Sequence, residues 1–171
     1  MDLLIIKSII LVIVLLVATI TDLTKNKVYN WLTFPAIILG LALNLFENGM
    51  LGCWQSASGL VIGGIVFLPL FLLKGMGAGD IKLMSVIGSF MGVIFVINSA
   101  IYIAILGGVI AIVMLIIKGK LLDMLKNISN ICLSSFMPKF SVHKSVNKET
   151  IPYAVVISLG TVLKYFLPNI I

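Results

Sequence analysis

The sequence contains very little charge. Only 11% of its 171 residues are charged and 61% are hydrophobic, whereas soluble domains average about 25% charged and 45–50% apolar residues. This composition excludes an ordinary soluble domain and indicates an integral membrane protein. Apolar runs occupy most of the length, so we expect one membrane-embedded domain over residues 1–171.

Arginine is absent, and cysteine and histidine are rare. The formal net charge of +6 is carried by lysines in short loops between apolar runs. We therefore interpret the lysines as topology signals, and we expect no nucleic-acid partner. Cys53 and Cys132 form no CxxC pair and His143 stands alone, so the sequence predicts no metal site, disulfide framework or cofactor.

The apolar runs predict an all-α polytopic membrane protein with about six transmembrane helices. Glu47-Asn48-Gly49 is expected to end the second span. Residues 81–117 as one helix would reach about 55 Å, which exceeds a bilayer, so Gly92 and Asn98-Ser99 are the expected breaks. The predicted spans cover residues 3–20, 31–46, 58–73, 81 to about 93, about 99–117, and 150–167.

The connecting segments predict caps and an orientation. Asn30 is a candidate helix N-cap, and Pro152 fits the first turn of the last helix. Residues 118–150 carry apolar side chains at helical spacing among lysines, which predicts an amphipathic helix on the membrane surface. All lysines except Lys7 and Lys164 fall at the first, third and fifth loops, so these loops should be cytoplasmic.

Two acids are expected at the same membrane depth. Asp22 closes the first span and Asp80 opens the fourth, so both should lie at the cytoplasmic rim. Two carboxylates in a partly desolvated site share one proton and can activate water. Gly77 and Gly79 would let a substrate backbone approach Asp80. The alternative interpretations are a simple helix-end acid for Asp22 and a simple N-cap for Asp80.

Residues 75–83, Gly-Met-Gly-Ala-Gly-Asp-Ile-Lys-Leu, resemble the GxGD signature of type IV prepilin peptidases, a family of membrane aspartic proteases that includes preflagellin peptidases. Thr21-Asp22 followed by residues 27–33 resembles the first aspartate block of that family. Residues 88–92 and 150–154 resemble its later blocks. Tyr29 stands where the family usually has proline.

The resemblance implies an aspartic endopeptidase of the cell membrane. It would cleave the short basic leader from prepilin or pseudopilin precursors at the cytoplasmic face, for a pilus, competence or secretion system. Because the chain has no CxxC pairs, methyltransferase activity is not expected. The resemblance implies a catalytic pair of Asp22 and Asp80, supported by Gly77, Gly79, Lys82, Asn30 and Pro152.

Two other functions fit the same residues. A small proton-coupled transporter could use Asp22 and Asp80 as a proton relay. A non-catalytic membrane assembly subunit would tolerate asparagine at either position. Cleavage of a precursor separates the peptidase from both.

Overall fold

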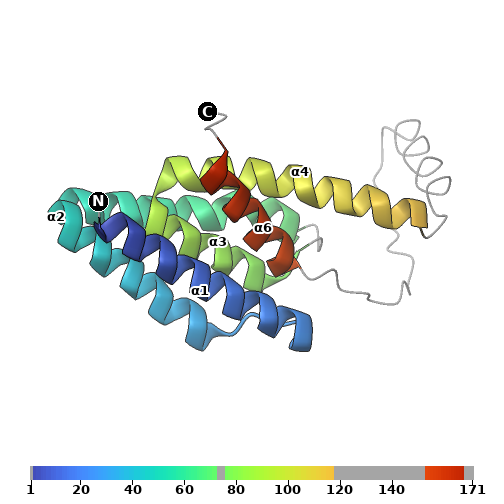
Figure 1. The fold of residues 1–171 in the computed structure, drawn as a ribbon, viewed down its shortest axis with the longest axis horizontal. Coiled ribbons are helices and arrows are strands. Elements are labelled where there is room, and N and C mark those ends of the chain that lie inside the picture. The colour runs from blue at the N-terminus through green and yellow to red at the C-terminus, as the bar shows by residue number, and fades with distance from the viewer. Residues whose placement is uncertain (1, 73–75, 118–152, 168–171) are drawn as a thin grey trace. The chain divides into compact units, whose positions relative to one another are not determined.

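A computed structural model describes residues 2–72, 76–117 and 153–167 of the chain. These residues form helices α1 (Asp2–Lys25), α2 (Asn30–Leu72), α3 (Ala78–Met91), α4 (Val93–Ile117) and α6 (Tyr153–Phe166), with no strand among them (Figure 1). The chain divides into two compact units, residues 1–106 with 152–171, and residues 107–151. Of the second unit, only the end of α4 is described. The all-α prediction is confirmed for the described residues.

Three of these helices are long and apolar enough to cross a membrane: Leu3–Lys25, Asn30–Leu72 and Val93–Met114. Helices α3 and α6 have 14 residues each, or about 21 Å, which is less than the hydrocarbon core. Large apolar side chains such as Phe46, Leu51 and Ile94 are more than 60% exposed, as lipid-facing residues are. The structure thus supports a helical membrane protein, while the count of six spans stays a prediction.

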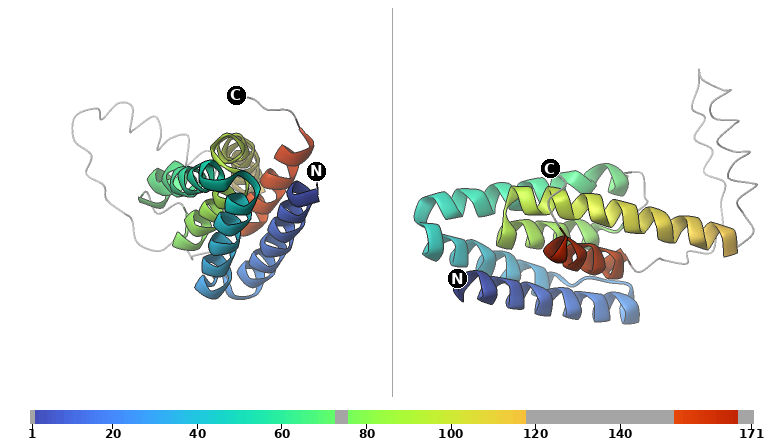
Figure 2. Two further views of the ribbon diagram at one scale, coloured as in Figure 1. Left: turned by 90° about the vertical axis from the view of Figure 1, so that its left-hand side faces the viewer. Right: turned by 45° about the horizontal axis from the view of Figure 1, so that its top comes forward.

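Helix α2 contains a break at Gly49. The backbone there has φ 59° and ψ −141°, a conformation that residues with a Cβ rarely adopt. The chain reverses direction at this point (Figures 1 and 2), which divides α2 into a first limb, residues 30–48, and a second limb, residues 50–72. The predicted end of the second span at Glu47-Asn48-Gly49 is therefore confirmed.

The break between α3 and α4 lies at Gly92, which has φ 80° and ψ −175°. The further break expected at Asn98-Ser99 was wrong, because both residues lie inside α4. Asn98 Nδ2 donates to the Ile94 carbonyl at 2.9 Å, and Ser99 Oγ donates to the Phe95 carbonyl at 2.8 Å. These bonds to the preceding turn satisfy the polar side chains without interrupting the helix.

Helix α3 is the buried centre of the first unit and contacts α1, α2 and α6. Its side chains Leu83, Met84, Val86 and Ile87 have no exposed surface. The second limb of α2 packs against α3 through glycines at positions 59, 63 and 88, where a Cβ would overlap the facing backbone. Small residues permit this close approach between helices in membranes. The packing fixes α3, and with it the start of the helix that carries Asp80.

Some predictions fall outside the described residues. The amphipathic surface helix predicted over residues 118–150 is one of them. The supporting role of Pro152 is another, and Cys132 and His143 lie in the same undescribed stretch.

Candidate active site

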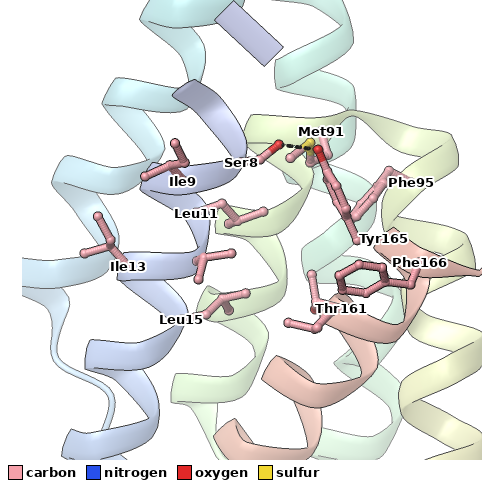
Figure 3. A pocket seen from close by; sticks show the side chains of 12 residues that line it. Ser8, Ile9, Leu11, Ile13, Leu15, Met91, Phe95, Thr161, Tyr165 and Phe166 are labelled. Carbon is pink, nitrogen blue, oxygen red and sulfur yellow. Dashed lines mark hydrogen bonds between the residues drawn. The ribbon is translucent and has the colours of Figure 1, made fainter. Parts of the chain in front are cut away.

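Two cavities differ in chemistry. One, of about 330 Å³, is lined by side chains of α1, α6, Met91 and Phe95 (Figure 3). Its lining is apolar apart from a few hydroxyls, and a 2.8 Å hydrogen bond joins Ser8 and Tyr165 at its edge. The other, of about 400 Å³, is lined by residues from the stretches 22–30 and 77–82, including Asp22 and Asp80. Only the second brings carboxylates together, so it is the candidate active site.

Asp22 lies in the last turn of α1, which continues five residues beyond the predicted end of the first span. Its side chain is 8% exposed. Asp22 Oδ2 accepts a hydrogen bond of 3.1 Å from the backbone N–H of Ala154, in the first turn of α6. A helix N-terminus favours a negative charge placed against it. The start of α6 therefore orients the Asp22 side chain.

Asp80 lies in the first turn of α3, just before the apolar run that begins at Ile81, and is 6% exposed. It is the third helical residue and not the N-cap, a position that Gly77 takes. Asp80 Oδ2 accepts the Gly77 N–H at 2.9 Å, and the Asp80 N–H donates to the Gly77 carbonyl at 3.2 Å. These reciprocal bonds hold the carboxyl facing the cavity.

The pKa of Asp80 is raised from 3.8 to about 6. Burial is the main cause; the Gly77 hydrogen bond opposes the rise, and the charge of Asp22 adds to it. Among the described residues, the one ion pair joins Lys7 to Glu47, so no lysine there neutralises either Asp22 or Asp80. The cavity thus combines an oriented carboxylate with a neighbouring carboxyl that holds its proton up to about pH 6.

Lys82 connects the two stretches that line the cavity. Its Nζ donates a 2.7 Å hydrogen bond to Asn30 Oδ1. Asn30 begins α2 as predicted, but its side chain holds Lys82. Tyr29 precedes the first helical residue, and its carbonyl accepts the N–H groups of Leu32 and Thr33, which are the first backbone hydrogen bonds of α2. The interpretation of Asn30 as N-cap was therefore wrong.

The loop between α1 and α2 is held without the family's usual proline. Asn26 adopts φ 50° and its N–H donates to the Asp22 carbonyl at 2.8 Å, which closes α1. Lys25 Nζ lies 5.6 Å from the centre of the Tyr29 ring, within the range of a cation–π contact. A tyrosine at position 29 is thus compatible with an ordered loop beside Asp22.

Gly77 and Gly79 occupy different surroundings. A Cβ at Gly79 would lie 2.9 Å from the Val28 Cβ, so this glycine lets α3 pack against the α1–α2 loop. Gly79 also lines the cavity, and its predicted role as an approach surface for substrate stays a prediction. A Cβ at Gly77 would lie 3.3 Å from Asp80 Oδ2. Gly77 itself is exposed and lines the cavity.

One cavity is lined by Asp22, Asp80, Asn30 and Lys82 together with both glycines. The structure also shows a donor that the sequence did not predict, the backbone N–H of Ala154, which bonds to Asp22. Every residue except proline has such a group, so the identity of residue 154 gave no signal. The pairing of Lys82 with Asn30 was also missed, since 52 residues separate them. Within the described residues, no cluster of three or more His, Cys, Asp or Glu side chains that could hold a metal ion is found.

Fold and site together define a helical membrane protein with two buried carboxyls in one polar cavity. The profile of the type IV leader peptidase family matches residues 9–112, which include both acids. The chain belongs to the type IV leader peptidase family, and family membership implies a protease acting on prepilin-type substrates. Searches of curated proteins and of solved structures returned no match. Nothing in these findings supports the transporter alternative.

Proposed function

We propose that the chain is an aspartic endopeptidase that removes the leader from prepilin or pseudopilin precursors, with Asp22 and Asp80 as its catalytic pair. The observation that carries this proposal is that both carboxyls line one polar cavity at the junction of α1, α2 and α3. Family membership supplies the reaction class. The test is cleavage of a tagged prepilin by the purified protein in lipid vesicles.

In the proposed mechanism, the two acids divide the work. The Asp22 carboxylate takes a proton from a water molecule as the water oxygen attacks the scissile carbonyl carbon. Asp80, which holds its proton because burial raises its pKa to about 6, donates a hydrogen bond to the carbonyl oxygen. Collapse of the tetrahedral intermediate breaks the C–N bond, and the leaving amine takes up a proton from the pair.

The proposed orientation places this cavity at the cytoplasmic face. Lys25, Lys27 and Lys82 lie at the same end of the helices as the two acids, whereas Lys7 lies near the other end of α1. Lysine-rich loops stay in the cytoplasm. Six spans, with both limbs of α2, α3 and α6 inserted, would put both chain ends outside.

The orientation predicts how a native thiol reacts. Cys53, in the second limb of α2 near the break at Gly49, is partly exposed, and it should be labelled in intact cells by a membrane-impermeant maleimide. Its removal in Cys53→Ser should abolish that signal. Labelling of Cys53 only after permeabilisation would contradict the orientation.

The pH dependence of cleavage should report the loss of the proton from Asp80. Because the pKa of Asp80 is raised, its protonated form persists to about pH 6, and kcat/KM should fall tenfold per pH unit above that value as the proton is lost. Values of kcat/KM measured in vesicles from pH 4.5 to 8.5 would show this fall. A constant kcat/KM between pH 6 and 8.5 would mean that Asp80 is not the acid.

The hydrogen bond between Lys82 and Asn30 should contribute to cleavage indirectly. We expect Lys82→Ala to lower kcat/KM about tenfold, because the two walls of the cavity lose their connection, and Lys82→Arg to be largely tolerated. Asn30→Ala should have the same effect, and the double variant should be no worse than either single one.

Lys27, on the same rim, provides the control, and Lys27→Ala should change the rate by about twofold at most. Additive losses at Lys82 and Asn30 would show that the two side chains act separately. A loss at Lys82 as severe as that at Asp80 would assign the lysine a direct role in the proton affinity of the acid pair.

A further inference from the structure

A second buried polar cluster lies at the opposite end of the helices from the acids. Lys7 of α1 is only 4% exposed. Its Nζ donates to Asn44 Oδ1 at 2.7 Å and forms an ion pair with Glu47, both on the first limb of α2. The chain has only 6 acidic residues in 171, so a buried lysine that pairs with one of them, the partly exposed Glu47, needs a reason.

Asn44 extends the cluster to α3. It is 8% exposed, and its Nδ2 lies 2.8 Å from the Ser89 carbonyl and 3.2 Å from the Phe90 carbonyl. Ser56, on the second limb of α2, also donates to the Ser89 carbonyl. Because α3 ends at Met91, these carbonyls have no partner within the helix. Asn44 and Ser56 therefore hold the end of α3 against both limbs of α2.

The same helices carry the acids at their other ends. Asp22 is 15 residues beyond Lys7 on α1, about 22 Å along the axis, and Asp80 is nine residues before Ser89 on α3, about 14 Å. A helix is stiff over such lengths. An axial shift of α1 against α3 at the Lys7 end is therefore carried to Asp22 and Asp80.

Most side chains between these ends are apolar and give no fixed axial register. Leu11, Leu15, Leu83 and Ile87 are buried there, and apolar contacts are non-directional. Hydrogen bonds and ion pairs have directions and lengths. A buried ion pair is weak evidence for stability, since apolar residues of similar volume often serve as well, and its best-attested use is to fix register.

We propose that Lys7, Asn44 and Glu47 are positioning residues that set the axial register of α1 against α3 and thereby the separation of Asp22 and Asp80. This inference rests on the proposed function for its catalytic consequence. The register between the two helices can be measured directly, without an assay of activity.

The structural test measures the distance between spin labels at the active-site end. Thr24→Cys on α1 and Ala78→Cys on α3 are exposed attachment points, in a background carrying Cys53→Ser and Cys132→Ser. Lys7→Met removes the charge and keeps the length of the side chain. We expect it to shift or broaden the distance distribution, and Lys7→Arg to restore the parent distribution.

Lys164→Met is the matched control. Lys164 is also a buried lysine, 7% exposed, but it lies on α6 over the ring of Phe95, so its loss should leave the distance between α1 and α3 unchanged. If Lys7→Met does not insert, Glu47→Gln makes the milder change, since Glu47 is partly exposed. A parent-like distribution in Lys7→Met, or in Glu47→Gln where Lys7→Met does not insert, would overturn the proposal.

The catalytic test compares kcat and KM in vesicles of the unlabelled protein. Lys7→Met should lower kcat about tenfold with KM within about twofold, because misplaced acids slow the chemical step more than they weaken binding. Lys7→Arg should recover most of kcat. An unchanged kcat in Lys7→Met would overturn the catalytic part of the proposal. Absence of cleavage by the parent protein would count against the proposed function, while the distance measurement would still decide the register.

Discussion

Asp22→Asn and Asp80→Asn are each expected to abolish precursor cleavage, with losses of at least about a thousandfold in kcat. General acid and general base assistance each contribute about 10²–10⁴-fold, and the proposed mechanism needs one carboxylate and one carboxyl at once. Asparagine keeps the size and can still accept the backbone hydrogen bonds from Ala154 or Gly77. Cleavage of a tagged prepilin in vesicles, normalised to inserted protein, measures the loss.

The two substitutions should differ in their effect on stability. The pKa of Asp80 is raised to about 6 in the folded protein, so the folded state favours its protonated form. The stability gained from that proton is complete below about pH 3.8 and is lost as pH rises through 6. Asp80→Asn removes the charge, so we expect a gain of up to about 3 kcal/mol above pH 7 and none at pH 3.5.

Measuring both activity and stability of the Asp80→Asn variant separates an effect on catalysis from an effect on folding. An Asp80→Asn protein that is inactive yet unfolds at a higher denaturant concentration than the parent at pH 8 would meet the expectation. Near-normal cleavage by either asparagine variant would remove that residue from the catalytic pair. Glu47→Gln also neutralises an acid, but it acts only through the register of α1 against α3, so its loss of activity should be about tenfold at most.

Gly88→Ala is expected to be the most damaging small substitution in the described core. The backbones of Gly59 and Gly88 face one another so closely that a Cβ on either would overlap the other's carbonyl group. Overpacking a tight contact costs about 1–3 kcal/mol, and here the groups that must move are main-chain atoms. We expect a loss near the upper end of that range, with partial loss of cleavage because α3 carries Asp80.

Gly108→Ala makes the same chemical change where a Cβ meets nothing within 4 Å. Alanine in an open helical position is neutral or mildly stabilising, so this variant should unfold at or slightly above the parent's denaturant midpoint. Denaturant titration of both variants in the same detergent gives the comparison. Equal midpoints for Gly88→Ala and Gly108→Ala would show that α2 and α3 separate without cost at this contact.

The sequence by itself determined the class of the protein and pointed to two of its acids. Long apolar runs allow only membrane helices, because unpaired backbone groups are too costly in lipid. In a chain with six acids, helix ends alone predicted that Asp22 and Asp80 lie at one depth. Glycine at position 49 predicted a break for a local reason, the backbone conformation that only glycine tolerates easily.

Tertiary structure decided what depends on partners distant in the chain. Asn98 and Ser99 look like helix breakers in sequence, yet each bonds to its own preceding turn within a packed helix. Asn30 has the residue type of an N-cap, but its side chain bonds to Lys82 on α3. Local patterns fix the conformations available to a residue, whereas hydrogen-bond partners and burial depend on which helices meet. For the same reason, only the packed helices could show three features of the protein: the hydrogen bond from the Ala154 N–H to Asp22, the raised pKa of Asp80 and the burial of Lys7.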